Sequence, residues 1–228
     1  MARKTILLLA FLAVLASGID FSSSESCEDS HEGHHHGHGH GNGNGNNNPN
    51  RGCEPGWTRF NRPSGGWCMR VIAGTGLTYA GATARCEYRN SLLSGVQTPA
   101  ELTWVHQTSS RSLAANVGLI WIGLRRKAGC LKKGLTPVCS QTNSFYWTDG
   151  VTTGTGALAW LNRSIPDNIM GGNQNCVLLF YAPGNYTHHG YNWFPGALDD
   201  VNCESTGREP VYGIRLVQGY LCGKRATQ

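Results

Sequence analysis

The sequence predicts an α+β domain held together by disulfides, and three observations lead to this class. A strand-like hairpin is followed by two helix-like segments and then by short strand-like runs, an order typical of α+β domains. The chain contains nine cysteines, enough for four disulfides and one unpaired thiol. Charged residues make up only 14% of the chain whereas glycine occurs 31 times, which indicates a loop-rich body that cross-links would stabilise.

Residues 1–18 have the features of a signal peptide. A basic start at Arg3 and Lys4 precedes an apolar run over residues 5–16, and small residues follow it up to Gly18. The alternative is an uncleaved anchor, but the run is shorter than the roughly 20 residues that a spanning helix needs. We therefore expect a secreted, extracellular protein without a membrane span, whose cysteines are oxidised.

Residues 19–52 are expected to form a disordered tail, because their Gly-, Asn- and His-rich composition offers little apolar surface to bury. Clustered neutral imidazoles on such a tail bind zinc or copper. The residues expected to do so are His34, His35, His36, His38 and His40. The alternative is a low-complexity spacer that responds to pH, since histidine titrates near about pH 6.5.

The folded body is expected over residues 53–225 and begins with a hairpin. Residues 56–60 and 67–72 resemble two strands, with a Gly-Gly turn before the second. Residues 78–89 are then expected to be helical. The residues near one face of this helix are Tyr79, Ala82 and Cys86.

A second helix has a clear start. Thr98 and Glu101 form a capping box, and Pro99 occupies the first helical position, where its missing N–H costs nothing. A core-facing stripe with helical spacing follows, made of Leu102, Val105 and His106. His106 is therefore expected to be a packed histidine and not a metal ligand.

Four further strands are expected beyond the second helix. They lie at residues 119–124, 145–148, 176–181 and 211–216. Stretches rich in Gly, Asn and Pro separate them, so the connections are expected to be long loops.

Five motifs occur in the order and among the cysteines that one known family requires. They are Trp121-Ile122-Gly123-Leu124, Phe145-Tyr146-Trp147-Thr148-Asp149-Gly150, Asn175-Cys176-Val177, Asp200-Val201-Asn202-Cys203 and Tyr220-Leu221-Cys222. On these motifs the chain from residue 53 to residue 222 resembles a C-type lectin-like domain. The resemblance implies an α+β C-type lectin-like fold, with two helices, small antiparallel sheets and a long-loop region.

The resemblance also implies how the cysteines pair. The expected disulfides are Cys53–Cys68, Cys86–Cys222 and Cys176–Cys203, and the remaining Cys130 and Cys139 would close a local loop. Cys27 in the tail is left unpaired. It would either join two chains into a covalent homodimer or be capped.

Family members that bind sugar do so through calcium, and this chain carries a degraded version of their site. The ligand positions fall on Asp167, Gln174, Asp199 and Asp200, whose oxygens suit calcium. Ile165, however, has no side-chain oxygen where the family has a carboxylate or amide, and Gln174 is neutral where an acid is usual. Weak calcium binding is still implied. The alternative is that Pro166 only shapes the loop and the acids are solvated.

Two further features bear on ligand binding. Asn162 and Asn185 begin N-glycosylation sequons, and a glycan on Asn162 would stand close to the expected calcium ligands. Residues 181–197 look like an insertion rich in aromatic residues, among them Tyr191 and Trp193. Such rings can stack on a sugar or anchor a protein partner, or they can pack together and stiffen the loop.

The expected function is recognition and not catalysis, because no motif of a catalytic site is present. We expect a secreted protein that binds glycans or a glycosylated surface, in a setting such as innate defence. One alternative is a calcium-independent module that binds an extracellular protein, and another is a metal-sequestering protein that acts through its His-rich tail. A nucleic-acid partner is not expected, because the formal charge of +5 is spread out and forms no basic cluster.

Overall fold

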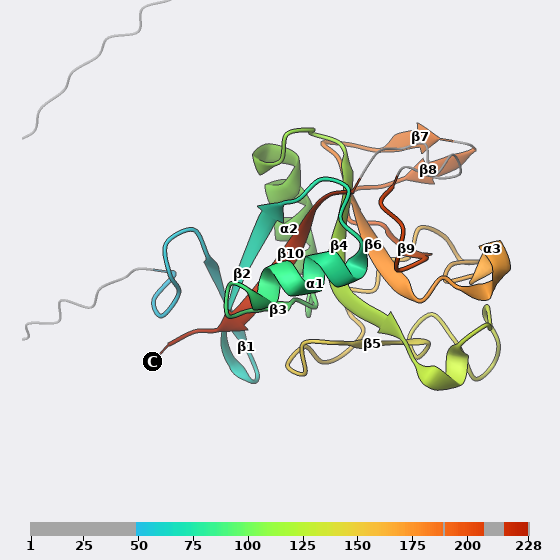
Figure 1. The fold of residues 1–228 in the computed structure, drawn as a ribbon, viewed down its shortest axis with the longest axis horizontal. Helices are drawn as coiled ribbons and strands as arrows, with labels where there is room; N and C mark the ends of the chain where they lie inside the picture. Colours follow the sequence, from blue (N-terminus) through green and yellow to red (C-terminus); the bar gives the residue numbers. More distant parts are fainter. Residues whose placement is uncertain (1–48, 189, 208–216, 228) are drawn as a thin grey trace, which may run out of the picture. The chain divides into compact units, whose positions relative to one another are not determined.

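The computed structural model of the chain describes residues 49–188, 190–207 and 217–227 (Figure 1). The predicted signal peptide, most of the tail with its histidines and Cys27, and the strand expected at residues 211–216 lie outside these ranges. Within them, no helix has both the length and the apolar character that a bilayer crossing requires.

A sheet of eight strands forms the centre of the fold, in the order β1-β2-β10-β4-β6-β9, with β3 paired to β10 and β5 to β4. Its strands are β1 (Thr58–Arg62), β2 (Gly65–Ala73), β3 (Leu92–Leu93), β4 (Gly118–Arg126), β5 (Phe145–Trp147), β6 (Cys176–Tyr181), β9 (Leu198–Val201) and β10 (Val217–Arg225). A two-stranded sheet consists of β7 (Tyr186–His188) and β8 (Tyr191–Trp193). Strands β4 and β10 pair in parallel, so the eight strands form one mixed sheet where the resemblance implied small antiparallel sheets.

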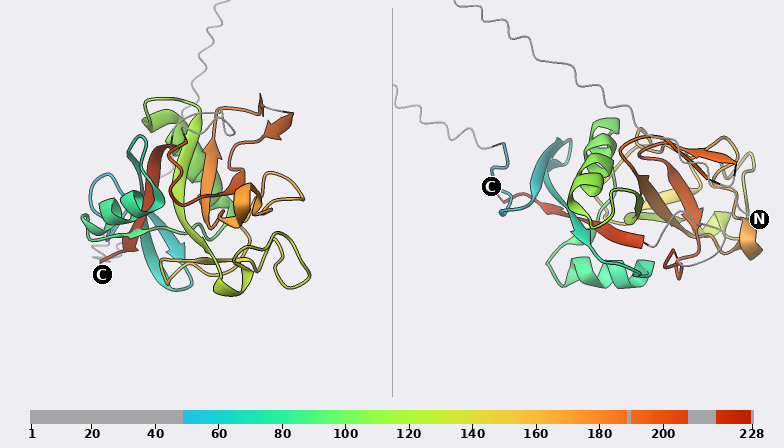
Figure 2. Two further views of the ribbon diagram at one scale, coloured as in Figure 1. Left: turned by 45° about the vertical axis from the view of Figure 1, so that its right-hand side comes forward. Right: turned by 90° about the horizontal axis from the view of Figure 1, so that it is seen from above.

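Two helices, α1 (Tyr79–Glu87) and α2 (Pro99–Ser112), lie on opposite faces of this sheet (Figure 2). Both predicted helix starts are confirmed, since Thr78 Oγ1 accepts from the Gly81 N–H at 3.2 Å and Thr98 Oγ1 from the Glu101 N–H at 3.1 Å. His106 on α2 is half-buried, and burial lowers its pKa, as expected for a packed histidine. Two short turns lie in the loops, α3 (Ile169–Gly172) and the 3₁₀ turn η1 (Ala128–Cys130).

The predicted hairpin is present, but its turn is tighter than the sequence suggested. Arg62 pairs with Gly65, so residues 63 and 64 make the turn and the Gly-Gly pair belongs to β2. Pro63 favours this placement because its fixed φ suits a turn and it offers no N–H to a strand ladder. Gly65 adopts a φ of 108°, which glycine tolerates best.

A buried ion-pair network ties the hairpin to α2. Arg62 Nε and Nη2 donate to the two carboxylate oxygens of Glu101 at 2.9 and 2.7 Å. Arg62 Nη1 donates to Thr152 Oγ1 at 2.9 Å, and that hydroxyl donates to Asp149 Oδ2 at 2.6 Å. Asp149 also accepts the backbone N–H groups of Val151 and Thr152, so this motif aspartate organises the turn after β5.

The Trp-Ile-Gly-Leu motif occupies the middle of β4 and has a packing role. The Trp121 side chain is fully buried, and its Nε1 donates to the Leu77 carbonyl at 2.7 Å. Gly123 lies against β3, where an added Cβ would be 2.2 Å from the Leu93 carbonyl oxygen. The motif therefore lets β3 and β4 approach each other closely.

All four expected disulfides are present: the three that the resemblance implied, and the one between the remaining Cys130 and Cys139. Cys86–Cys222 spans 136 residues and ties α1 to β10, at the centre of the sheet. Cys53–Cys68 and Cys176–Cys203 close loops of 15 and 27 residues, and Cys130–Cys139 closes one of only 9.

Candidate functional site

The long loops between β5 and β9 are held against the sheet by packed apolar side chains, as well as by the strands that they connect. The Trp160 ring packs against Phe145 with a centroid separation of 5.3 Å, and its Nε1 donates to the Gln141 carbonyl at 2.7 Å. Trp160 also forms a bridge with Leu198, the first residue of β9. The loop backbone is therefore held against the sheet at the place where the calcium ligands were expected.

The triplet Ile165, Pro166 and Asp167, where the first calcium ligands were expected, does not present a set of oxygen-bearing side chains. Ile165 is only 6% exposed and belongs to the hydrophobic core. The Ile165–Pro166 peptide bond is cis, and the Ile165 carbonyl accepts from Gln141 Nε2 at 2.6 Å. Asp167 is half-buried, and its Oδ1 accepts from the Ile169 N–H at 3.2 Å. Only Asp167 of this triplet keeps a carboxylate near the surface.

Asp200 forms a buried ion pair with Arg126, the last residue of β4. Arg126 Nη2 donates to Asp200 Oδ2 at 2.5 Å, and neither side chain is exposed to solvent. The backbone N–H groups of Asp167 and Asn168 donate to Asp200 Oδ1 and Oδ2 at 3.1 and 2.9 Å. Both oxygens of the carboxylate therefore already have donors from the protein.

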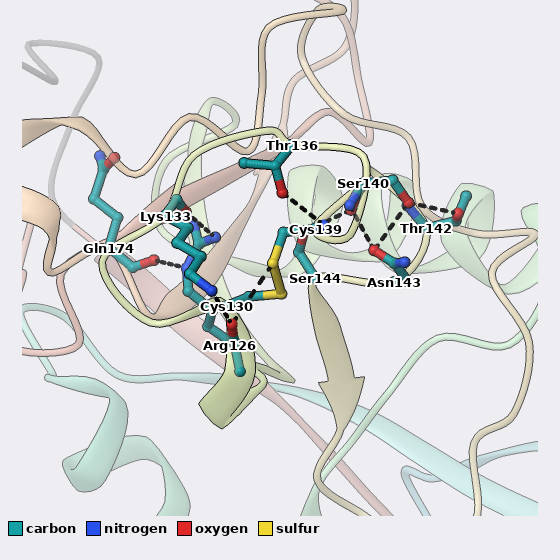
Figure 3. The surroundings of a disulfide bond; sticks show 11 residues. Arg126, Cys130, Lys133, Thr136, Cys139, Ser140, Thr142, Asn143, Ser144 and Gln174 are labelled. Carbon is teal, nitrogen blue, oxygen red and sulfur yellow. Dashed lines mark hydrogen bonds between the residues drawn. A yellow bond between two sulfur atoms is a disulfide. The ribbon is translucent and has the colours of Figure 1, made fainter.

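The other donors of the Arg126 guanidinium bind backbone carbonyls. Nε donates to the Gln174 carbonyl at 2.9 Å and Nη1 to the Lys133 carbonyl at 3.0 Å (Figure 3). Lys133 lies in the small loop that Cys130–Cys139 closes, so this disulfide helps to fix one acceptor. The guanidinium face also lies 4.6 Å from the centroid of the Phe145 ring. Arg126 is thus the centre of a polar cluster that joins β4, β9 and two loops.

Gln174 contributes its backbone to this cluster. Its N–H donates to Asn168 Oδ1 at 2.9 Å, while its carbonyl faces Arg126. Asn168 adopts a left-handed backbone conformation with φ of 51°, which asparagine tolerates better than most residues. The loop from Asn168 to Gln174 is therefore shaped around the Arg126–Asp200 pair.

The two aspartates of β9 lie in surroundings that disfavour their charged forms. Burial raises the pKa of Asp200 to about 6, against the opposing effect of Arg126. Burial also raises the pKa of Asp199 well above its usual value, and the nearby charges of Asp200 and Asp167 add to this. Among the described residues, Asp199 has no salt bridge, and no group of three acidic, His or Cys side chains is arranged to hold a metal ion.

Replacing Asp199 by asparagine is expected to stabilise the protein at neutral pH by about 1–3 kcal/mol, because it removes a carboxyl group whose ionised form burial disfavours. An acid whose pKa is raised by folding binds its proton more tightly in the native state, so its contribution to stability is lost as pH rises above 3.8. The gain should therefore be large at pH 7 and nearly absent at about pH 4. Urea unfolding at both pH values measures it.

The half-buried Asp167 supplies the matched control, and Asp167→Asn should change the free energy of unfolding by less than about 0.5 kcal/mol. A loss of stability in Asp199→Asn at pH 7 would contradict the expectation. So would a gain that is the same at both pH values.

The β7–β8 hairpin carries the aromatic residues of the insertion. Tyr186 pairs with Trp193 and His188 with Tyr191 in its register. Trp193 is only 5% exposed and packs on Phe180 of β6 with a centroid separation of 5.5 Å, so it anchors the hairpin. Tyr191 is 53% exposed. Of the two expected ligand-contacting rings, only Tyr191 is accessible in the described structure.

The two sequon asparagines lie in different surroundings. Asn185 is exposed, immediately before β7. Asn162 is half-buried, and its Oδ1 accepts from the Ser164 N–H at 2.7 Å. Glycosylation of either residue stays a prediction.

The sequence did not indicate that Arg126 belongs to this site. Arg125 and Arg126 look alike in sequence, yet Arg125 is exposed and Arg126 is 4% exposed. The alternation of side chains along a strand could have indicated that one of the two faces inward. No local signal joins Arg126 to Asp200, which lies 74 residues further along the chain.

Comparison with known proteins agrees with this architecture. A model of the family described as C-type lectin domain-containing protein 141/158 matches residues 56–225, whereas no curated protein matches the chain. The chain is similar to the carbohydrate-recognition domain of the mouse scavenger receptor C-type lectin, with 19% identity, a TM-score of 0.45 and coverage of 77% of this chain and 98% of that one.

Two further solved structures are similar at the same identity of 19% and the same coverage of 77% of this chain. One is the carbohydrate-recognition domain of cow CD23, with a TM-score of 0.45 and 98% of that chain covered. The other is the Ca²⁺-independent C-type lectin SPL-2 from Saxidomus purpuratus, with a TM-score of 0.47 and 96% of that chain covered. Since the family match covers most of the chain, the C-type lectin-like fold is confirmed, and the chain belongs to the C-type lectin domain-containing protein 141/158 family.

Proposed function

We propose that this protein is a secreted recognition protein that binds a glycan without calcium. Its family membership supports recognition as the general function. Four disulfides and the predicted signal peptide support an extracellular setting. Metal binding by the His-rich tail and a covalent dimer through Cys27 stay predictions on residues outside the described ranges.

The main evidence for calcium-independent binding is the Arg126–Asp200 ion pair. A calcium ion needs 6–8 oxygen ligands, chiefly from carboxylates and carbonyls. Asp200 is already neutralised by a guanidinium at 2.5 Å, and Ile165 offers no side-chain oxygen. The residues at the four expected ligand positions therefore do not fit a calcium site, because a second cation beside Arg126 would be repelled.

The contact surface that we propose is the exposed end of the β7–β8 hairpin at Tyr191, beyond the rings that pack toward β6. Tyr186, His188 and Tyr191 lie on the same face as the buried anchor Trp193. The Tyr186 and His188 rings are stacked with their centroids 6.2 Å apart. An exposed tyrosine at the end of such a row suits a sugar ring, because tyrosine combines an apolar ring with a hydroxyl that can form hydrogen bonds.

Calcium is expected to leave the thermal unfolding midpoint unchanged. A ligand that binds only the folded state raises this midpoint in proportion to its occupancy. Differential scanning fluorimetry with millimolar calcium, compared with a chelator, measures the effect. A rise that grows with calcium concentration, and that is lost in Asp200→Asn, would overturn the proposal.

Binding on a glycan array is expected to survive the chelator and to depend on Tyr191. Tyr191→Ala should weaken binding of the recognised glycan about tenfold, because ring stacking contributes roughly 1 kcal/mol or more to the binding free energy. The matched control is Tyr88→Ala, which removes an exposed tyrosine beyond the end of α1. Equal losses in the two variants would exclude the hairpin as the contact surface. Binding only to protein ligands, unchanged after their deglycosylation, would favour protein recognition instead.

A further inference from the structure

A second surface, distinct from the long-loop region, has the features of an anion site. A hollow of about 540 Å³ is lined by Arg51, Arg59, Arg225, the Ser64–Gly66 segment and the two residues after β10, Ala226 and Thr227. The C-terminal end of β10, which forms one wall, lies at the left of Figure 1, and α3 of the long-loop region lies at the right.

Backbone hydrogen bonds hold the walls of this hollow together. The Ala226 N–H donates to the Gly66 carbonyl at 2.9 Å, and the Thr227 N–H donates to the Gly52 carbonyl at 2.8 Å. The Arg59 N–H donates to Asn50 Oδ1 at 3.0 Å. The Cys53–Cys68 disulfide joins β2 to the segment before β1. Three separate stretches of chain are therefore fixed around one space.

The three arginines bring positive charge to the hollow. Among the described residues, the lining includes no acidic side chain, and none of the three arginines forms a salt bridge. The nearby Glu54 is paired with Lys224 at 2.7 Å. Like charges gathered in this way repel one another, so an anionic ligand would be favoured there.

Two of the guanidinium groups are held in place by acceptors that carry no net charge. Arg59 donates to Asn61 Oδ1 and to the Arg51 carbonyl, and Arg225 Nη1 donates to the Ser64 carbonyl at 3.1 Å. Each guanidinium has five N–H donors, so these bonds orient the groups and use only part of their capacity.

Gly66 keeps the hollow open. A Cβ at this position would be 2.9 Å from Cζ and Nη2 of Arg59 and 2.8 Å from the Cβ of Ala226. Any side chain here would therefore displace Arg59 from its present position. The present position of Arg59 therefore depends on glycine at residue 66.

From this arrangement we propose that the Arg51–Arg59–Arg225 pocket binds a saccharide that carries tetrahedral oxyanions, as sulfate or phosphate esters. Planar guanidinium groups bind such anions with paired hydrogen bonds. The volume exceeds that needed by one inorganic ion and lies in the range of small-ligand sites, about 300–1,000 Å³. The hydroxyls of Ser64 and Thr227 suit the remaining polar groups of a sugar. This site does not depend on the proposed function of the β7–β8 hairpin.

Calorimetry on the full chain tests this proposal with four probes: a sulfated disaccharide, the same disaccharide without sulfate, a phosphorylated hexose and inorganic sulfate. At least one esterified sugar should bind about tenfold or more tightly than the unsulfated disaccharide and than inorganic sulfate. Whichever of the sulfated disaccharide and the phosphorylated hexose binds more tightly identifies the preferred ester. Affinity should fall as sodium chloride rises from about 0.05 M to about 0.2 M, because salt screens exposed charges.

Arg51→Gln and Arg225→Gln should each weaken binding by about fivefold or more, and Gly66→Ala should do so through Arg59. Arg51 and Arg225 are exposed, so their variants are expected to keep the fold, which the thermal midpoint checks. The matched control is Arg111→Gln on the last turn of α2, which removes the same charge and should change affinity by less than about twofold. Tyr191→Ala should leave this binding unchanged, which separates the pocket from the hairpin.

Losses in the Arg51 and Arg225 variants no greater than in Arg111→Gln would overturn the proposal. Equal binding of the unsulfated disaccharide, or of inorganic sulfate alone, would overturn it as well. If a poly-glutamate peptide competes for the pocket as strongly as the esterified sugar does, the ligand is an acidic peptide and not a saccharide.

Discussion

Arg126→Met is expected to lower the free energy of unfolding by about 3–5 kcal/mol at pH 7, because it leaves the buried carboxylate of Asp200 without its counter-charge. The change also removes the donors to the Gln174 and Lys133 carbonyls. Burial raises the pKa of Asp200 to about 6 even with Arg126 present. At about pH 4 Asp200 should be neutral with or without Arg126, so the loss there should be smaller than at pH 7.

Arg125→Met is the matched control for this variant, because Arg125 is the exposed neighbour on the same strand. It should cost less than about 1 kcal/mol, the most that its contact with the Tyr79 ring would contribute. Asp200→Asn and the double variant with Arg126→Met complete a double-mutant cycle that isolates the coupling of the pair. Urea unfolding measures all four proteins. Similar losses in the Arg125 and Arg126 variants would show that the pair is not a major source of stability.

Removal of the Cys86–Cys222 disulfide, by alanine at both positions, is expected to cost on the order of 5 kcal/mol. A cross-link stabilises a protein mainly by restricting the unfolded chain, and the effect grows with the logarithm of the loop length. This loop spans 136 residues and joins α1 to β10. A loss of this size is a large fraction of the roughly 5–15 kcal/mol that stabilises a typical domain.

The Cys130–Cys139 disulfide provides the control within the same chain. Its loop spans 9 residues, so its removal should cost about 2–3 kcal/mol. All four cysteines are buried, so the packing lost on replacement by alanine is similar in the two variants. The difference between the two losses then reports the effect of loop length. Equal losses, measured from denaturant midpoints with equal slopes, would contradict the chain-entropy explanation.

Much of the fold was predictable because its signals are local or appear as ordered motifs. The cap at Thr98 and the proline after it specify where α2 begins, whatever the rest of the chain does. The Trp-Ile-Gly-Leu motif indicated the central strand, and Gly123 is explained by the close approach of β3. The turn of the first hairpin was placed less well, since the Gly-Gly pair looked like the turn while Pro63 makes it.

The candidate site was predictable only in part. The motif positions directed attention to Asp167, Gln174, Asp199 and Asp200, and a calcium role for these residues stays a prediction. That Trp193 is an anchor and Tyr191 is exposed depends on where the hairpin packs on Phe180 of β6, which their similar surroundings in sequence do not reveal.

The amino-acid order alone was enough to predict the α+β class, the helix starts and, with the family resemblance, the four disulfides. Arg126 beside Asp200, and the gathering of Arg51, Arg59 and Arg225 around one hollow, became apparent only once the strands were paired. The reason is physical: capping and periodicity act between residues a few positions apart. Which charges meet across 74 residues depends on strand order, register and burial, and these are properties of the whole packed sheet.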